Sequence, residues 1–309
     1  MTDLLSPSPF LYKQQKGLLS ACVVTRNARE SLKQYLDSLI ESNGGQNPLE
    51  IIVVDNDSSD GTKAMLEKDF PQAHYIFCQP GIGFSKGVNQ ALYVSKGELI
   101  AIATPSTKIQ GNAIHVLLNF MTQSETIGVI GPKVLNQDGT TQHSSKKMPT
   151  PKVAMLHTLY RLGIIRSNEN LNEYFLLDYE SDQPRRVESL TMSFMLARRK
   201  VFEEIGLLDE DLFAWASDVD WCHRVEQSRR WQQWFVPAAK VIHHRSSVSK
   251  KQPYANLRYY HRDLKIFYQK HFASNSGWLV NALWRLMLQA RFWVQAIRYI
   301  FTKDDFTFY

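Results

Sequence analysis

The chain has 309 residues, 44% of them hydrophobic and 21% charged, and a net charge of +6. This length and composition support a buried core in one large domain or two ordinary ones, and they exclude disorder, a collagen repeat and a coiled coil. Residues 1–150 carry 13 basic and 13 acidic residues, whereas 221–303 carry 15 basic residues against Glu226 and Asp263 alone, so the C-terminal third predicts an anionic partner.

Strand-like and helical patterns alternate through the first 125 residues. Four short apolar runs have the length and β-branched content of buried strands: 18–24, 49–54, 74–78 and 99–103. Helical spacing of apolar residues follows the first three runs, at 31–40, at 60–66 with Asp60 as a cap, and at 88–94. This alternation predicts an α/β fold with a mostly parallel sheet, right-handed βαβ units and helices on both faces.

Polar residues follow each of these runs. They are Thr25, Arg26 and Asn27 after the first, Asp55 and Asn56 after the second, a glycine loop with Gly83, Lys86 and Asn89 after the third, and 104–107 after the fourth. Because ligands bind beyond the carboxyl ends of parallel strands, these residues predict a nucleotide site along one sheet edge. The sequence has neither a G-x-G-x-x-G motif after the first strand nor a G-x-x-x-x-G-K-[ST] phosphate loop.

The middle of the chain contains shorter elements. A turn-rich stretch at 136–140 follows the apolar residues 128–132, and a strand is expected at 193–199 with a short helix at 200–205. Residues 213–222 begin a helix that continues to Val225. A strand at 236–242 then ends at His243, His244 and Arg245.

The C-terminal region predicts a long amphipathic helix. Residues 277–301 span about 37 Å if helical, since the rise is about 1.5 Å per residue. Three arginines on the polar side of the helix argue against a membrane-spanning segment. We expect this helix to lie on an anionic membrane surface, with Trp278, Trp284 and Trp293 at the interface. Packing against the domain, or against the partner in a homodimer, is the alternative.

Cysteine usage and the N-terminus bear on the compartment. Cys22, Cys78 and Cys222 do not show zinc-binding spacing, and their small number fits a reducing cytoplasm. The N-terminus is unlike a secretory signal, because Asp3 and two prolines precede a short first apolar run. No helix-turn-helix, zinc-finger or RNP-type motif supports a nucleic-acid partner.

A set of motifs, taken in order, resembles the family 2 glycosyltransferases of the GT-A fold, and most closely their bacterial rhamnosyltransferase-like branch. The motifs lie at 23–27, 51–61, 83–89, 128–139, 194–199, 206–210, 218–222 and 236–244. The ordered set gives the resemblance its specificity. It implies a mixed, mostly parallel GT-A sheet flanked by helices. The implied regions are an N-terminal extension at 1–17, a nucleotide-sugar-binding half at 18–125, an acceptor-binding half at 126–248 and a basic, amphipathic helical region at 249–309.

By this resemblance the protein moves a sugar from a nucleotide diphosphate to an acceptor hydroxyl, with inversion at the anomeric carbon. Such a displacement needs a base for the acceptor proton and positive charge on the leaving diphosphate. Asp218 matches the base, although a carboxylate at a helix N-terminus is also stabilised by the helix macrodipole without a catalytic role. The residues assigned to the acceptor side are Ser193, Trp215, Ser217, Asp220 and Trp221.

The nucleotide contacts implied by the resemblance lie in the first half. They are Thr25, Arg26, Asn27, Asp55, Asn56, Gly83, Lys86 and Asn89. Asp55 matches a carboxylate on the base or ribose, although a turn with a helix cap uses the same residue types. Gly83 and Gly87 match a loop in which missing side chains let the backbone approach the nucleotide. For Lys86 the alternative is a solvated surface lysine.

The chain departs from the family at the usual metal position. Family members usually carry an Asp-x-Asp-like element whose last carboxylate holds a divalent cation on the diphosphate, and the matching residues here are Thr104, Pro105 and Ser106. A serine hydroxyl is a weak ligand for Mg²⁺ or Mn²⁺, so the usual metal anchor is missing. Three other lining positions also differ, at Ser189, Met192 and Ser217.

Two accounts fit these departures. In the first, cationic side chains replace the metal on the diphosphate, drawn from Arg26, Lys86, His243, His244 and Arg245. In the second, the site is degenerate and the protein binds a sugar nucleotide, glycan or partner enzyme without turnover. We favour the first because Asp218 is retained. The two histidines also suit simple packing at the end of a strand.

The sequence therefore predicts an inverting glycosyltransferase that moves a hexose, with rhamnose as the first choice. The expected acceptor is a lipid-linked, for example polyprenyl-linked, or cell-envelope glycan. The expected location is the inner face of the cell membrane, with peripheral attachment through 277–301.

Overall fold

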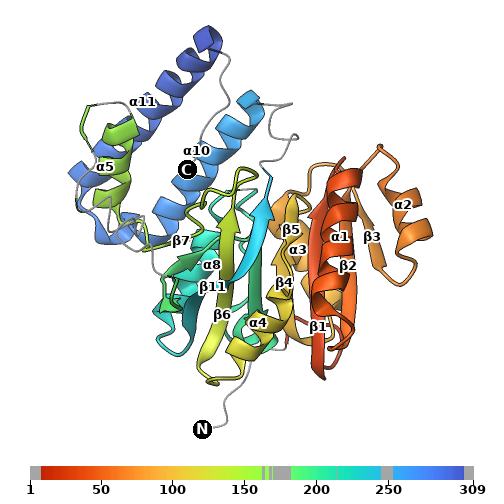
Figure 1. Cartoon of the computed structure of the whole chain (residues 1–309). Coiled ribbons are helices and arrows are strands. Elements are labelled where there is room, and N and C mark those ends of the chain that lie inside the picture. The colour runs from red at the N-terminus through yellow and green to blue at the C-terminus, as the bar shows by residue number, and fades with distance from the viewer. Residues whose placement is uncertain are drawn as a thin grey trace.

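The computed structural model describes residues 8–161, 164–166, 169, 182–213, 215–244 and 253–302. A nine-stranded sheet forms its centre (Figure 1), in the order β3-β2-β1-β4-β10-β6-β11-β5, with β8 paired to β11. Its strands are β1 (Gln15–Thr25), β2 (Leu49–Asn56), β3 (His74–Cys78), β4 (Gly97–Ala103), β5 (Thr107–Ile109), β6 (Ile127–Leu135), β8 (Arg185–Arg186), β10 (Phe194–Arg198) and β11 (Gln232–His243). β7 (Ser145–Lys146) and β9 (Ser189–Leu190) form a separate two-stranded sheet.

Strand directions confirm the predicted mixed, mostly parallel sheet. β3, β2, β1 and β4 are parallel to one another, and β11 is parallel to β6. β10 is antiparallel to both of its neighbours, β4 and β6. The parallel strands therefore all end at one edge, where ligands bind in sheets of this type.

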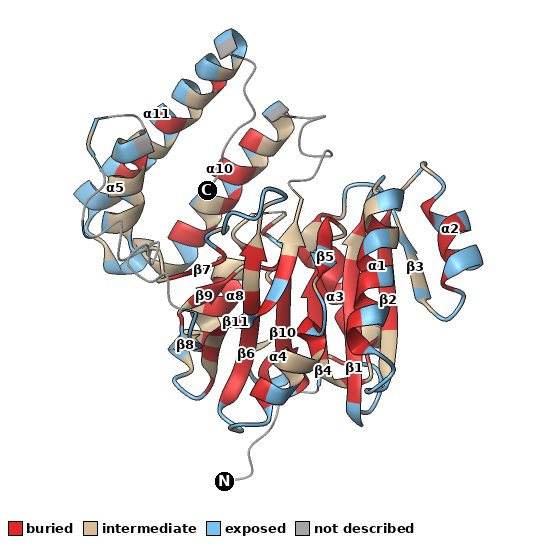
Figure 2. Ribbon diagram, in the orientation of Figure 1, coloured by how far each residue is buried: buried red, intermediate tan, exposed pale blue. Residues whose placement is uncertain are grey.

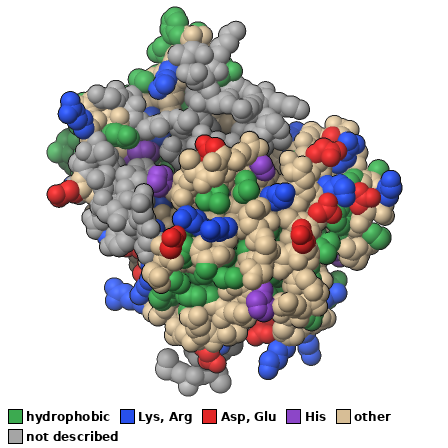
Figure 3. Space-filling view, viewed as in Figure 1, with side chains coloured by type: hydrophobic (Ala, Val, Ile, Leu, Met, Phe, Trp, Pro, Cys, Tyr) green, Lys and Arg blue, Asp and Glu red, His purple; other side chains and the backbone are tan. Residues whose placement is uncertain are grey.

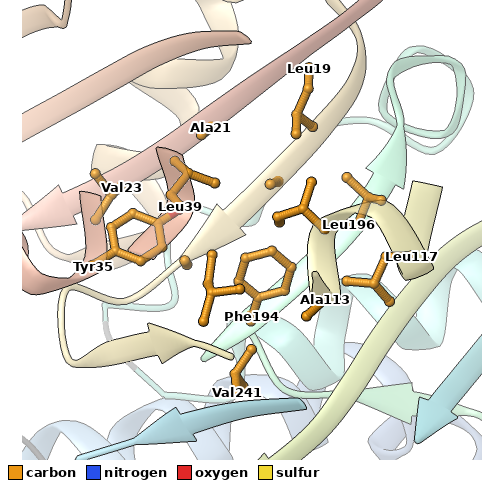
Figure 4. Packing of buried hydrophobic residues seen from close by; sticks show 14 of the residues in the cluster. Leu19, Ala21, Val23, Tyr35, Leu39, Ala113, Leu117, Phe194, Leu196 and Val241 are labelled. Atoms are coloured by element: carbon orange, nitrogen blue, oxygen red, sulfur yellow. The ribbon is translucent and has the colours of Figure 1, made fainter. Parts of the chain in front are cut away.

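Helices cover both faces of the sheet (Figure 1). They are α1 (Arg29–Asn43), α2 (Thr62–Asp69), α3 (Phe84–Val94), α4 (Ala113–Met121), α5 (Pro151–Arg161), α7 (Arg199–Ile205), α8 (Ser217–Gln227), α10 (Pro253–His271) and α11 (Trp278–Thr302), with a 3-10 turn at Ala273–Asn275. Successive side chains of β1 point to opposite faces of the sheet, so they contribute to two hydrophobic cores, one on each face. Leu19, Ala21 and Val23 pack with α1 and α4 (Figure 4), whereas Cys22 packs with α3, α7 and α8.

Three helices lie together above the edge at which β6 and β11 end (Figure 1): α5, α10 and α11, called here the helical lobe. Asp220 of α8 anchors α10, since its carboxylate lies 2.6 Å from Nε2 of His271. Tyr268 of α10 stacks on Trp284 of α11 with ring centroids 3.9 Å apart. These contacts fix the lobe over the edge where the predicted site residues lie.

The C-terminal helix has the predicted extent, but two of its residues face another way. Trp284 is buried against Tyr268, so it is not available to a membrane interface, and Arg291 is 5% exposed instead of lying on an outer polar side. The outer apolar residues do not pack on the described domain and are exposed (Figure 2): Trp278, Leu279, Val280, Leu283, Leu286, Trp293, Val294, Ile297, Ile300 and Phe301. Across the described ranges, no helix has the length and apolar character needed to cross a membrane.

Candidate active site

The ends of β1 and β2 bring two predicted residues together. Thr25 and Asp55 are partners in the register of these strands. Asp55 is fully buried, and its carboxylate oxygens accept hydrogen bonds from the Ser58 N–H and from the Tyr75 hydroxyl, both at 2.8 Å. The buried Thr25 hydroxyl has no hydrogen-bond partner in the part of the chain that the structure describes. Since an unsatisfied buried hydroxyl is unfavourable, this edge is suited to a polar ligand.

Residues around Thr25 and Asp55 form the rim of this edge. Arg26 is exposed, and Asn27 holds a left-handed φ of 48°. Asn56 joins the rim to the glycine loop, because its side-chain oxygen accepts the Gly81 N–H at 3.1 Å. Lys86 is exposed, as expected of a surface lysine.

The glycine loop is shaped by contacts within the protein that require glycine by themselves, and its approach to a nucleotide stays a prediction. A Cβ at Gly83, where φ is +79°, would lie 2.6 Å from the Phe213 carbonyl oxygen. A Cβ at Gly87 would lie 2.8 Å from a methyl group of Val24. Asn89, by contrast, is corrected. It is 2% exposed, and its side chain bonds both the N–H and the carbonyl of Leu208, so it holds α3 against the loop between α7 and α8.

Asp218 lies in the first turn of α8, beside the helical lobe. The residue before this helix is strained, because Ala216 has a left-handed φ of 60°. Burial raises the pKa of Asp218, while the charge of Lys146 and the N–H groups of Val219 and Met192 act in the opposite direction. A carboxylate with a raised pKa accepts a proton more readily near neutral pH, which is the property of a general base.

Lys146 is the charged partner of Asp218, and the sequence patterns did not assign it. The pairing of β7 with β9 places Lys146 opposite Ser189. The lysine is 8% exposed, and burial lowers its pKa to about 8, while the charge of Asp218 opposes this shift. In the sequence, Lys146 and Lys147 resemble a solvated basic pair, and only the two-residue strand reveals that one of them is buried.

The residues expected on the acceptor side separate into two sets. Trp215 borders the same cavity as Asp218. Ser217 is buried beside it and hydrogen-bonds Oγ of Ser85 at 2.7 Å, which links the start of α8 to α3. Trp215 and Ser217 therefore lie next to the predicted base, and acceptor contacts by them stay a prediction.

Asp220 and Trp221 are corrected to structural residues. Trp221 is 0% exposed, stacks on Phe202 with centroids 4.4 Å apart and donates its indole N–H to the Gly206 carbonyl at 3.0 Å. Asp220 is 2% exposed and is bonded to His271 and Arg224. Because helix periodicity turns these two side chains inward, they hold the fold and do not border the cavity.

The residues at the usual metal position meet where β5 pairs with β11. The His244 N–H donates to the Ser106 carbonyl at 2.9 Å, and His243 is the partner of Thr107 in the strand register. Ser193 belongs to the same group, since its carbonyl accepts the Thr107 hydroxyl at 2.7 Å. Arg245 lies outside the described residues.

This group does not fit a divalent cation of the kind the family uses. Ser106 supplies only a neutral hydroxyl, and Nδ1 of His243 lies 3.2 Å from the side-chain oxygen of Gln142. Within the described ranges, no group of three or more His, Cys, Asp and Glu side chains could hold a metal ion. Mg²⁺ and Mn²⁺ favour anionic oxygen ligands, which the group lacks.

Asp218 and Lys146 border a cavity of about 120 Å³ beneath the helical lobe. Its walls come from α5, the start of α8, α10 and α11, and most of them are apolar, with Val153, Phe267 and Leu288 as examples. The site thus combines the carboxylate of Asp218, the amine of Lys146 and the guanidinium of Arg291 with mostly apolar walls, which suits an amphiphilic ligand.

Fold and site together define a GT-A glycosyltransferase, an enzyme that transfers a sugar. The chain belongs to glycosyl transferase family 2, whose model matches residues 20–206. It is 25% identical over 284 residues, 88% of each chain, to the N-acetylglucosaminyl-diphospho-decaprenol L-rhamnosyltransferase of Mycobacterium tuberculosis. These matches confirm the resemblance inferred from the ordered motifs.

Two solved structures show the same fold at low identity. GalNAc-T7, solved with UDP, GalNAc and Mn²⁺, has a TM-score of 0.55 and 15% identity, and the match covers 84% of this chain and 55% of that one. The mannosyltransferase PcManGT from Pyrobaculum calidifontis, solved with GDP-Man and Mn²⁺, has a TM-score of 0.53 and 14% identity, over 97% of this chain and 91% of that one.

Proposed function

We propose that this enzyme transfers L-rhamnose, or a closely related hexose, from a nucleotide diphosphate to a glycan carried on a polyprenyl diphosphate. The observation that carries the proposal is the position of Asp218, which is partly buried, has a raised pKa and borders an apolar cavity. Similarity over 88% of both chains to a rhamnosyltransferase named for a decaprenyl-linked acceptor supports the choice of donor and acceptor.

In the proposed reaction, the polar edge at Thr25 and Asp55 holds the nucleotide. Asp218 accepts the proton of the acceptor hydroxyl as its oxygen attacks the anomeric carbon, and the bond from that carbon to the diphosphate breaks with inversion. Lys146 keeps Asp218 ionised by its positive charge. Side chains of the protein offset the charge of the leaving diphosphate, with Arg26 and Lys86 as candidates beside His243 and His244, whose strand end pairs with residues 106 and 107.

The test is a transfer assay with the full chain, a nucleotide-diphospho-L-rhamnose and an N-acetylglucosaminyl-diphospho-prenol, run with EDTA and with Mn²⁺ in parallel. We expect product from the wild type and a loss of about 10²-fold or more in Asp218→Asn, because a general base contributes about 10²- to 10⁴-fold. Asp37→Asn, on the exposed side of α1, is the matched control and should keep the wild-type rate. Undiminished transfer by Asp218→Asn would exclude this residue as the base, and donor binding without transfer in the wild type would contradict the proposed reaction.

We also propose that the outer face of α11 attaches the enzyme to the inner surface of the cell membrane. Ten large apolar side chains of α11 are exposed, and hydrophobic side chains are visible at the top of the molecule (Figure 3). Exposed apolar side chains gathered along one helix are typical of a surface that contacts a membrane or another protein. Basic residues near an anionic bilayer contribute about 1 kcal/mol each. This attachment suits an acceptor that is itself anchored in lipid.

Point substitutions on the outer face test this attachment. Leu286→Glu with Ile297→Glu should release the protein from anionic vesicles in a sedimentation assay, whereas Leu11→Glu, at an equally exposed apolar residue outside the lobe, should not. Full sedimentation of the double variant would rule the attachment out. If the wild type is a dimer by gel filtration and the double variant a monomer, the face is a dimer interface instead.

A further inference from the structure

The helical lobe carries a buried cation that has no acidic partner among the residues the structure describes. Arg291 lies on the inner face of α11, in the wall of the cavity that Asp218 also borders. It is 5% exposed. Three more residues of the same wall, Trp284, Met287 and Leu288, precede it at helical spacing, so Arg291 continues an otherwise apolar face.

Within the described part of the chain, the contacts of Arg291 include a hydroxyl and an aromatic ring but no carboxylate. One Nη donates to the Tyr260 hydroxyl at 3.1 Å, and the guanidinium lies 5.3 Å from the centroid of the same ring. The Nε–H has no acceptor among the described residues, and no described carboxylate lies within 4.0 Å of the guanidinium. Asp263, the single acidic residue of α10, instead accepts the Trp215 N–H at 2.9 Å.

A buried guanidinium without a counter-ion is strongly unfavourable, so its retention in an apolar wall points to an anionic ligand. Arginine suits phosphate in particular, because its donors match phosphate oxygens in pairs. The surrounding wall, with Val153, Phe267 and Leu288, suits hydrocarbon. Phosphate next to hydrocarbon is the chemistry of a prenyl diphosphate, and neither inorganic phosphate nor a neutral lipid matches both parts of the wall.

The residues around the cavity also suit a prenyl diphosphate that carries a sugar. Asp218 borders it, so a sugar attached to a phosphate held by Arg291 would extend toward the proposed base. The other side of the same helix carries exposed apolar residues, among them Leu283 and Leu286. The volume of about 120 Å³ is small for a complete lipid, so only the head group and the first part of the chain fit inside.

We propose that the cavity of the helical lobe is the acceptor subsite, in which Arg291 binds a phosphate of a prenyl diphosphate and the apolar wall receives the first part of its chain. The identity of the full acceptor rests on the proposed function, but binding of the prenyl diphosphate does not. Arg291 is therefore a substrate-binding residue distinct from the base.

Binding can be measured by fluorescence of the tryptophans that line the cavity, with three probes: farnesyl diphosphate, inorganic pyrophosphate and farnesol. We expect the wild type to bind farnesyl diphosphate more tightly than either of the other two. Arg291→Met should weaken this binding about ten- to a hundred-fold, the value of a hydrogen-bonded charge, and Arg291→Lys should restore part of it. Arg285→Met, which removes an exposed arginine from the same helix, is the matched control and should bind as the wild type does. The thermal midpoint of each variant reports whether it is folded.

Two results would overturn the proposal: equal binding of farnesyl diphosphate by folded Arg291→Met and wild type, or pyrophosphate binding as tight as farnesyl diphosphate binding, which would make the site a plain phosphate site. Asp218→Asn separates this proposal from the transfer reaction, since it should bind the probe normally while transfer fails. Transfer with a raised acceptor KM in Arg291→Lys supports the subsite, whereas transfer with an unchanged acceptor KM in Arg291→Met contradicts it and leaves the proposed function intact.

Discussion

Replacement of His261 by Phe should reduce the loss of stability that the wild type shows when the pH falls from 7 to 5. His261 lies on α10, is 7% exposed and packs edge-on against Phe292 with ring centroids 5.3 Å apart. Its Nδ1 lies 2.9 Å from the Leu257 carbonyl oxygen, and its Nε2 has no hydrogen-bond partner in the described chain. Burial lowers the pKa of His261 to about 4, and the charge of Arg291 acts in the same direction.

The sign and size of the effect follow from linkage. In the unfolded chain the imidazole has its ordinary pKa of about 6.5, so between pH 6.5 and pH 4 the unfolded state binds a proton that the folded state does not. Stability is therefore complete above pH 6.5 and is lost as the pH falls. The expected loss in the free energy of unfolding is about 2 kcal/mol between pH 7 and pH 5, and about 3 kcal/mol once the pH is below 4.

Urea unfolding followed by tryptophan fluorescence, at pH 7 and at pH 5, measures this difference. Other groups titrate equally in both proteins, so the quantity of interest is the change in pH dependence from wild type to His261→Phe. His74→Phe, at an exposed position of β3, is the matched control and should keep the wild-type pH dependence. If His261→Phe loses as much stability on acidification as the wild type, the low pKa of His261 is wrong.

Three further predictions concern single side chains. The acidic limb of the kcat/KM profile, which reports the ionisation of Asp218, should move to higher pH in Lys146→Met and stay in place in Lys146→Arg, because the positive charge at this position lowers the pKa of Asp218; the same acidic limb in both variants would contradict the role of Lys146. Gly83→Ala should lower the thermal midpoint sharply, since its Cβ would meet backbone at 2.6 Å, whereas Gly111→Ala, also at positive φ but in open space, should lower it less. Asp220→Asn should destabilise the protein by about 3 kcal/mol in urea, because it breaks a buried ion-paired group, whereas the exposed control Asp211→Asn should change little; equal effects would contradict the anchoring role of Asp220.

The sheet and its polar edge could be predicted from the sequence, because the spacing of apolar residues and the residue types that favour turns are visible in short stretches of neighbouring residues. The run at 18–24 became β1 (Gln15–Thr25), and Thr25 and Asp55 meet at its end as expected. Asn89 and Trp221 could not be placed this way. Both residues lie in motifs that also occur in ligand sites, so the local sequence does not distinguish a ligand contact from a packing role. Only packing between distant segments shows that Asn89 bonds Leu208 and that Trp221 stacks on Phe202.

Lys146 and Arg291 were not predicted as site residues for a different reason. Lys146 lies in a two-residue strand with no periodicity of its own, and its burial depends on β9, more than forty residues later in the chain. The inward orientation of Arg291 depends on which side of α11 meets Tyr268, and a helical stripe that is apolar on more than one side does not fix this rotation. α4 and α5 were not predicted, although α5 supplies one wall of the cavity. Thr150 and Pro151 are a start signal for α5 that was not recognised in the sequence, since the Thr150 hydroxyl oxygen accepts the Val153 N–H at 3.2 Å.

The stack of Trp284 on Tyr268 sets the rotational phase of α11, and this phase decides two surfaces at once. One residue inserted ahead of Trp284 would rotate the rest of the helix by about 100°. This rotation would move Arg291 out of the cavity wall and turn apolar side chains such as Leu286 toward the cavity. Deletion of the whole helix would likewise remove the proposed membrane-binding face and the proposed acceptor subsite together. Truncation at the C-terminus therefore cannot distinguish an enzyme that no longer binds the membrane from one that no longer binds its acceptor. Substitutions confined to one side of the helix can distinguish these two effects.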